Sequence, residues 1–195
     1  MNTQNTPVHI KLWHRDFWLM AVASLLLTLS VYILLPVMPR WLMEEENFTA
    51  VEAGRCMGVF GLGIYLFGGF CSWLVQRYRR NVVCMWAIVA LIANLFFLWY
   101  IDTLRGQFVD FSIIMVHRFL LGAMFGLAQQ VLSSTLIIDT CESFQRTEAN
   151  HSASWFARFA LSLGPFAGLV VYMMDGFRSV VYGAVGCAVV ALLLV

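Results

Sequence analysis

Residues 117–126 read HRFLLGAMFG, an apolar stretch in which Arg118 is followed by glycines at the fourth and eighth positions after it. The stretch lies within a longer apolar run that is long enough to cross a membrane as a helix. An arginine in hydrocarbon costs from about 2.5 to more than 10 kcal/mol, so a chain keeps one only where the guanidinium meets water, a partner or a substrate. Arg118 is therefore the first candidate functional residue.

The composition supports a membrane protein. Of the 195 residues, 61% are hydrophobic and 12% are charged, whereas soluble domains carry roughly 25% charged residues. The formal net charge is +1, so no large basic surface exists and a nucleic-acid partner is not expected. A multi-pass protein of a plasma membrane or a bacterial inner membrane is predicted.

Six apolar stretches are long enough to span a bilayer, and at these lengths only helices satisfy their own backbone in lipid. The first sixteen residues are polar and show no cleavable signal pattern, so the first span is expected to be retained. The sixth span runs to Val195 without a polar flank. We therefore expect an all-α six-helix unit over residues 1–195, and a chain that ends inside its last helix is expected to be a fragment. The predicted spans are 17–39, 53–75, 82–101, 111–137, 152–174 and 178–195.

The placement of basic residues predicts that both ends of the chain lie in the cytoplasm. One side holds six lysines or arginines and the other holds four, and the Arg77–Arg80 cluster in a short loop carries most of the difference. The first group is Lys11, Arg15, Arg77, Arg79, Arg80 and Arg146, and the second is Arg40, Arg55, Arg105 and Arg178.

The sequence predicts neither an enzyme nor a metal centre. Five cysteines are scattered without a CxxC or Cys/His ligand spacing, so neither a disulfide framework nor a zinc site is indicated, and no cofactor is expected. The nucleophile and metalloprotease motifs of intramembrane hydrolases are missing as well.

Several spans carry polar or small residues at helical spacing. Ser24, Thr28 and Tyr32 share one face of the first span, which is expected to meet a cavity or another helix. A stripe of small residues follows the second span, and we expect helix packing there, with a sliding surface as the alternative. The stripe comprises Gly54, Gly58, Gly61, Tyr65, Gly68 and Ser72.

In the fourth span, Gln129 and Ser133 lie within about 20° and 60° of Arg118 around the helix axis. Arg118, Gly122, Gln129 and Ser133 should therefore share one face, along which water or a polar solute could be contacted. The alternative is that Arg118 snorkels to the outer surface. In the fifth span, Arg158 follows the same logic, with cavity and surface both open.

Three segments resemble signatures of the major facilitator superfamily of secondary transporters. Residues 72–81, SWLVQRYRRN, resemble its G-x-x-x-D-R-x-G-R-[RK] loop, with Arg77 and Arg80 in the central basic positions. Gln76 replaces the aspartate of that pattern, which puts the charge-relay gating that the pattern implies in doubt. An ordinary basic loop is the alternative. The fourth span resembles the fourth-helix signature of the family through Arg118, Gly122 and Gly126. The fifth span resembles the fifth-helix G-P-x-x-G signature, which is associated with proton-coupled exporters, through Gly164, Pro165 and Gly168.

The resemblance implies one half of a major facilitator fold, built from inverted three-helix repeats, with the solute site between two halves. The implied function is secondary active transport of a small solute by alternating access. A non-transporting membrane scaffold or receptor derived from a transporter fold is the alternative. Expected partners are an anionic small solute, protons, membrane lipid and a second half or second copy. Substrate or coupling contacts are expected at Arg118, Gln129, Arg158, Ser24, Thr28 and Tyr32, and packing or gating at Gly122, Gly126, Gly164, Pro165, Gly168, Gln76, Arg77 and Arg80.

Charged residues at the span ends bear on gating and coupling. The loop that contains Asp139, Glu142, Arg146 and Glu148 is expected to pair with the Arg77–Arg80 cluster at the cytoplasmic side. No carboxylate is expected deep in any span, because Asp16, Asp110, Asp139 and Asp175 all fall at span ends. A proton-coupling acid is therefore expected outside this half, if the transporter uses one.

Overall fold

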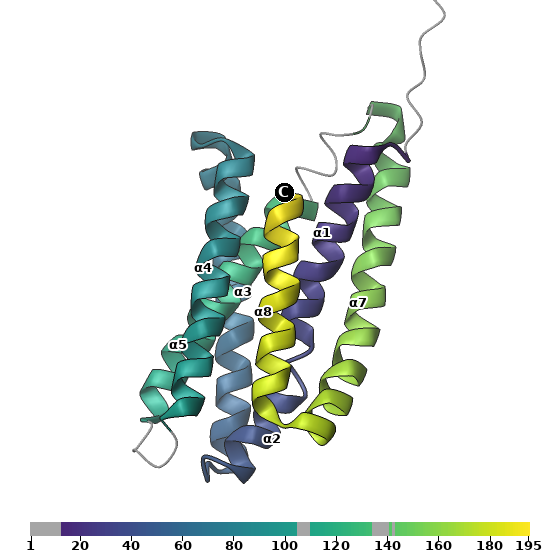
Figure 1. The fold of residues 1–195 in the computed structure, drawn as a ribbon. Helices are drawn as coiled ribbons and strands as arrows, with labels where there is room; N and C mark the ends of the chain where they lie inside the picture. The colour runs from purple at the N-terminus through teal and green to yellow at the C-terminus, as the bar shows by residue number, and fades with distance from the viewer. Residues whose placement is uncertain (1–12, 105–109, 134–140, 142) are drawn as a thin grey trace, which may run out of the picture.

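The computed structural model describes residues 13–104, 110–133, 141 and 143–195, and most of these residues are helical. Six of its helical segments are long and apolar enough to cross a membrane, which confirms the all-α membrane fold. Figure 1 shows the long helices side by side, with the α3–α4 turn and the C-terminus at one end of the bundle and α2 at the other. The elements are α1 (Arg15–Tyr32), α2 (Val37–Glu44), α3 (Ala50–Arg77), α4 (Arg80–Thr103), α5 (Phe111–Val131), the short 3-10 helix η2 (Ser143–Gln145), α7 (Arg146–Asp175) and α8 (Phe177–Leu194).

The first span is broken between α1 and α2, just before Pro36. Proline has no N–H to donate, so it cannot form the usual helical bond to the carbonyl of Tyr32. That carbonyl instead accepts from the Leu35 N–H at 3.3 Å, and Leu34 likewise bonds three residues back to Val31. The helix resumes when Met38 N–H donates to the Leu34 carbonyl at 3.0 Å. The break therefore arises from local backbone bonding.

Helices α3 and α5 are in close contact because glycines on both helices leave no side chain between the backbones. A Cβ atom built at Gly122 would overlap the backbone carbonyl of Phe60 on α3, and one at Gly63 would overlap the carbonyl of Phe119. Gly126 faces Ile64 in the same way. Close approach of this kind gains dispersion contact where lipid offers no hydrophobic driving force.

Helix α7 packs against the break in the first span. A Cβ atom at Gly168 would overlap the backbone of Ile33, and Gly164 faces Tyr32. Pro165 lies between these glycines inside a helix that continues to Asp175. The chain then turns at Gly176, whose φ of 82° suits glycine, and α8 begins at the next residue.

Helices α3 and α7 carry the most exposed apolar faces of the bundle. In the most apolar stretch of each span, 17% of the residues of α3 and 22% of those of α7 are buried, against 56% for α5. The predicted packing of the α3 stripe stays a prediction, because within the described chain Cβ atoms built at Gly54, Gly58, Gly61 and Gly68 meet nothing within 4 Å. The glycine that packs closely on α5, Gly63, lies outside that stripe.

Candidate functional site

Arg118 lies in the contact between α5 and α3. Its side chain is 2% exposed, and its guanidinium carbon lies 6.0 Å from the centre of the Phe60 ring. Its Nε and Nη2 atoms are buried and have no hydrogen-bond partner within the described part of the chain. Arg118 therefore lies away from any open surface, and none of the described carboxylates pairs with it.

The surroundings of Arg118 compensate its charge only in part. A cation above an aromatic ring gains about 0.5–2 kcal/mol, whereas burying an ionised group without a counter-charge costs considerably more. At the end of the bundle that carries α2, the structure describes two ion pairs, Arg40 with Glu44 and Arg178 with Asp102. Neither pair involves Arg118. A buried guanidinium with unused donors is therefore the least satisfied charged group in the described bundle.

The face that carries Arg118 divides between two neighbouring helices. Gly122 packs on α3 near Arg118, while Gln129, farther along α5, donates from Nε2 to Ser24 Oγ on α1 at 2.9 Å. The Oε1 atom of Gln129 is buried and has no partner among the described residues. The residues that share one face by sequence spacing thus contact α3 at one end and α1 at the other.

Polar residues of α1 are buried and bond mainly within their own helix. The hydroxyl of Thr28 donates to the Ser24 carbonyl at 2.8 Å. Ser24 also accepts the bond from Gln129, so it links α1 to α5. Tyr32 packs edge-on against Phe125 of α5, with ring centres 6.1 Å apart. Ser24, Thr28 and Tyr32 therefore lie along the contact between α1 and its neighbours.

Arg158 lies apart from Arg118, on an exposed face of α7. The hydroxyl of Ser162, one turn farther along, donates to the Arg158 carbonyl at 3.2 Å. Ser162 is exposed too. Arg118 and Arg158 therefore occupy different environments, one buried between helices and one on an open helix face.

The basic cluster lies at the turn between α3 and α4. Gln76 and Arg77 end α3, Arg80 begins α4, and all three are exposed. Of the acidic residues expected to pair with this cluster, Asp139 and Glu142 lie outside the described residues. Glu148 is exposed in the first turn of α7. The predicted closure of this end of the bundle stays a prediction.

Asp102 is a buried carboxylate that the sequence interpretation overlooked. It lies in the last turn of α4 with no exposed surface. Its Oδ2 accepts from Arg178 Nε of α8 at 2.7 Å, and its Oδ1 accepts from Trp41 Nε1 of α2 at 3.3 Å. Trp41 in turn stacks on Phe177, with ring centres 4.5 Å apart. The network joins α2, α4 and α8 at the α2 end of the bundle. The available signal was Arg178, which lies on the same predicted side of the membrane as the end of the third span.

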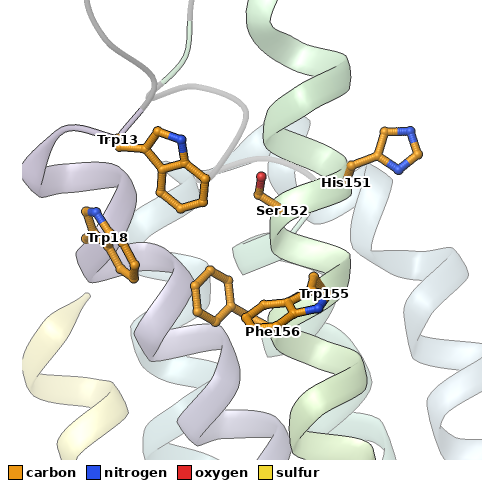
Figure 2. Close-up of a pocket in the computed structure, with 6 residues that line it drawn as sticks. All are labelled: Trp13, Trp18, His151, Ser152, Trp155 and Phe156. Atoms are coloured by element: carbon orange, nitrogen blue, oxygen red, sulfur yellow. The ribbon is translucent and has the colours of Figure 1, made fainter.

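Aromatic side chains line a pocket of about 400 Å³ where α1 and α7 begin. Figure 2 shows the rings of Trp13, Trp18 and Phe156 around the hydroxyl of Ser152, while His151 points away from them. The Trp18 and Phe156 ring centres are 5.7 Å apart. Tryptophan is enriched where a membrane meets water, so this cluster is typical of an interfacial anchor.

Six spanning helices and intramembrane polar groups define a multi-pass integral membrane protein. Residues 20–195 match the family described as Major Facilitator Superfamily, so the chain belongs to that superfamily. The chain is also 26% identical, over 188 residues, to a protein named "Probable hexose phosphate transport protein" from Chlamydia pneumoniae. The match covers 91% of this chain and 38% of the relative, so this chain spans about two fifths of that protein's length.

Proposed function

We propose that this chain forms the N-terminal six-helix half of a secondary active transporter that moves a small anionic solute by alternating access. The observation that carries the proposal is the buried guanidinium of Arg118, with its unpaired Nε and Nη2 atoms. A solute anion that reaches this site would supply the missing acceptor and counter-charge. Arginine binds carboxylate and phosphate through two parallel hydrogen bonds, which gives such a contact both strength and orientation.

The class of solute is proposed to be a sugar phosphate. Support comes from the similarity to the Chlamydia pneumoniae protein named "Probable hexose phosphate transport protein". Because this chain spans 38% of that relative, we propose that a second six-helix half, or a second copy, completes the transport path. Gln129, Ser24, Thr28, Tyr32 and Arg158 are proposed as secondary contacts to the solute or to the coupling network.

Alternating access requires that Arg118 changes its exposure during the cycle. In the described arrangement Arg118 is covered by α3, which packs on α5 through backbone contacts at Gly122 and Gly126. A glycine contact holds no interlocking side chains, so α3 can shift along α5 with few rotamer changes. We propose that such a shift opens Arg118, while Gly164, Pro165 and Gly168 let α7 move against α1. The Gln76–Arg80 turn is proposed to gate the opposite end.

The test is uptake of radiolabelled glucose 6-phosphate by bacterial cells that lack their own uptake system and express the full-length protein. Arg118→Gln is expected to lower the initial rate at least tenfold, because the guanidinium and its two hydrogen bonds are lost. Arg118→Lys keeps the charge and is expected to retain part of the rate. Arg55→Gln removes an exposed arginine on α3 and is the matched control, with uptake unchanged.

Uptake must be compared at equal amounts of protein in the membrane. An Arg118→Gln rate equal to that of Arg55→Gln would contradict the role of Arg118. If the unaltered protein binds glucose 6-phosphate but shows no counterflow in proteoliposomes, the alternative of a receptor derived from a transporter fold would be supported instead.

A further inference from the structure

An apolar groove of about 550 Å³ runs between the end of α3, the start of α4 and one face of α5. Its volume falls in the range of roughly 300–1,000 Å³ that small-molecule sites occupy. Trp86 is 69% exposed, so the groove opens outward from the bundle at α4. The lining residues are Leu74, Tyr78, Val82, Val83, Trp86, Ala87, Ala90, Met124 and Leu127.

A basic depression adjoins this groove at the α3–α4 turn. It is lined by Arg79, Arg80, Asn81 and Val82 and measures about 450 Å³. Val82 belongs to both linings, so the apolar groove and the basic depression adjoin at this residue. Arg79 in this lining and Arg77 at the end of α3 are both exposed. The position that carries an aspartate in the related loop signature holds Gln76 in this chain, so no carboxylate at that position opposes an incoming anion.

We propose that the groove and the depression together bind an anionic phospholipid, with an acyl chain against Trp86 and Ala90 and the phosphate at Arg79 and Arg80. Two different environments, one apolar and one basic, adjoin at Val82. A phospholipid is apolar along its chain and negatively charged at its head, and this surface presents the matching order. Basic clusters next to membrane helices attract anionic lipid in the same way.

A soluble solute fits this surface less well than a lipid does. The groove wall is made of aliphatic and aromatic side chains and offers a sugar few hydrogen-bond partners besides the Tyr78 hydroxyl. Arg118 lies in the contact with Phe60, a residue of α3 about four to five turns from the end that carries Leu74 and Tyr78. The site is therefore separate from the proposed solute contact, and its test does not depend on transport.

The test uses the full chain in nanodiscs and measures quenching of Trp86 fluorescence by phospholipids with brominated acyl chains. The Trp86 signal is the difference between the protein and its Trp86→Phe variant. Brominated phosphatidylglycerol is compared with brominated phosphatidylcholine, and the ratio of the two half-saturating lipid fractions gives the preference for the anionic lipid. Arg79→Gln is expected to lower this preference about fivefold. Arg55→Gln is the control and is expected to leave it unchanged.

A second variant separates the groove from general surface charge. Ala90→Phe fills the groove and keeps the arginines, and it is expected to reduce Trp86 quenching by both lipids. Equal preferences in Arg79→Gln and Arg55→Gln would overturn the proposal. So would displacement of phosphatidylglycerol by inorganic phosphate alone, which would assign the depression to a soluble anion. Loss of Trp86 quenching on raising the protein density in the discs would assign the groove to a second copy and would overturn the proposal as well.

Discussion

The ion pair between Asp102 and Arg178 joins two groups with very different access to water. Asp102 has no exposed surface, whereas the side chain of Arg178 is 51% exposed. Removing the arginine leaves a buried carboxylate, while removing the carboxylate leaves an arginine that water can solvate. Because an uncompensated buried charge is the costly product of breaking such a pair, the two removals should differ in cost.

Arg178→Gln is therefore expected to destabilise the protein more than Asp102→Asn. We expect a loss of about 1–3 kcal/mol for Arg178→Gln. Asp102→Asn should cost less, because its amide oxygen can still accept from Trp41. Thermal unfolding in detergent, followed by near-UV circular dichroism, measures both.

Two further variants check the interpretation of this pair. The double variant Arg178→Gln/Asp102→Asn should be more stable than Arg178→Gln alone, since it removes the stranded charge. Arg40→Gln breaks the ion pair between Arg40 and Glu44, whose side chains are 46% and 50% exposed respectively. Because this pair is exposed to water, its loss should change the melting temperature little. A larger loss in Asp102→Asn than in Arg178→Gln would refute the asymmetry.

At the scale of elements, the glycines of α3 and α5 fall into two groups. A Cβ atom at Gly122 or Gly63 would collide with the neighbouring helix, whereas one at Gly61 meets nothing within 4 Å among the described residues. The same residue type therefore serves close packing at some positions and leaves an open face at others. Spacing in the sequence does not separate the groups, because both occur along apolar helices.

Alanine substitutions should separate these groups. Gly122→Ala is expected to destabilise the bundle by about 1–3 kcal/mol, because a methyl group is forced against the Phe60 backbone. Gly61→Ala should be neutral or stabilising by about 0.5–1 kcal/mol, since alanine favours the helix and meets no neighbour. Both effects can be measured by denaturant titration in mixed micelles. A loss in Gly61→Ala equal to that in Gly122→Ala would show that the stripe is packed in the folded protein.

At the scale of the whole molecule, the two ends of the bundle differ in charge. The end with the α3–α4 turn carries the arginine cluster, and the opposite end carries α2 with the acidic residues Glu44 and Glu45 (Figure 1). The arginine-rich end is expected in the cytoplasm, because basic residues are retained there during insertion.

Cysteine labelling tests this orientation. Asn81→Cys, at the α3–α4 turn, should react with an impermeant maleimide only in inside-out vesicles, and Asn47→Cys, before α3, only in right-side-out vesicles. Both positions are exposed. The background carries Cys141→Ser and Cys187→Ala, since the other three cysteines are buried. Labelling of both positions from the same side would contradict the topology.

The amino-acid sequence by itself determined the helical membrane fold and its order of spans. Runs of about 20 apolar residues permit few other structures in lipid, where each backbone group needs an internal partner. It also identified Arg118 as a residue that needs compensation. These conclusions depend on composition and local backbone bonding, which a linear sequence contains.

Only the tertiary structure decided which helix each face meets. It placed Arg118 against Phe60, divided its face between α3 and α1, and left the α3 glycine stripe open. It also brought Asp102 to Arg178, 76 residues away along the chain. Helices in lipid pack through shape and a few polar contacts, because apolar surface is equally satisfied by lipid or by protein. Hydrophobic periodicity therefore cannot distinguish a packed face from a lipid-facing one, and the pairing of helices has to come from three-dimensional contacts.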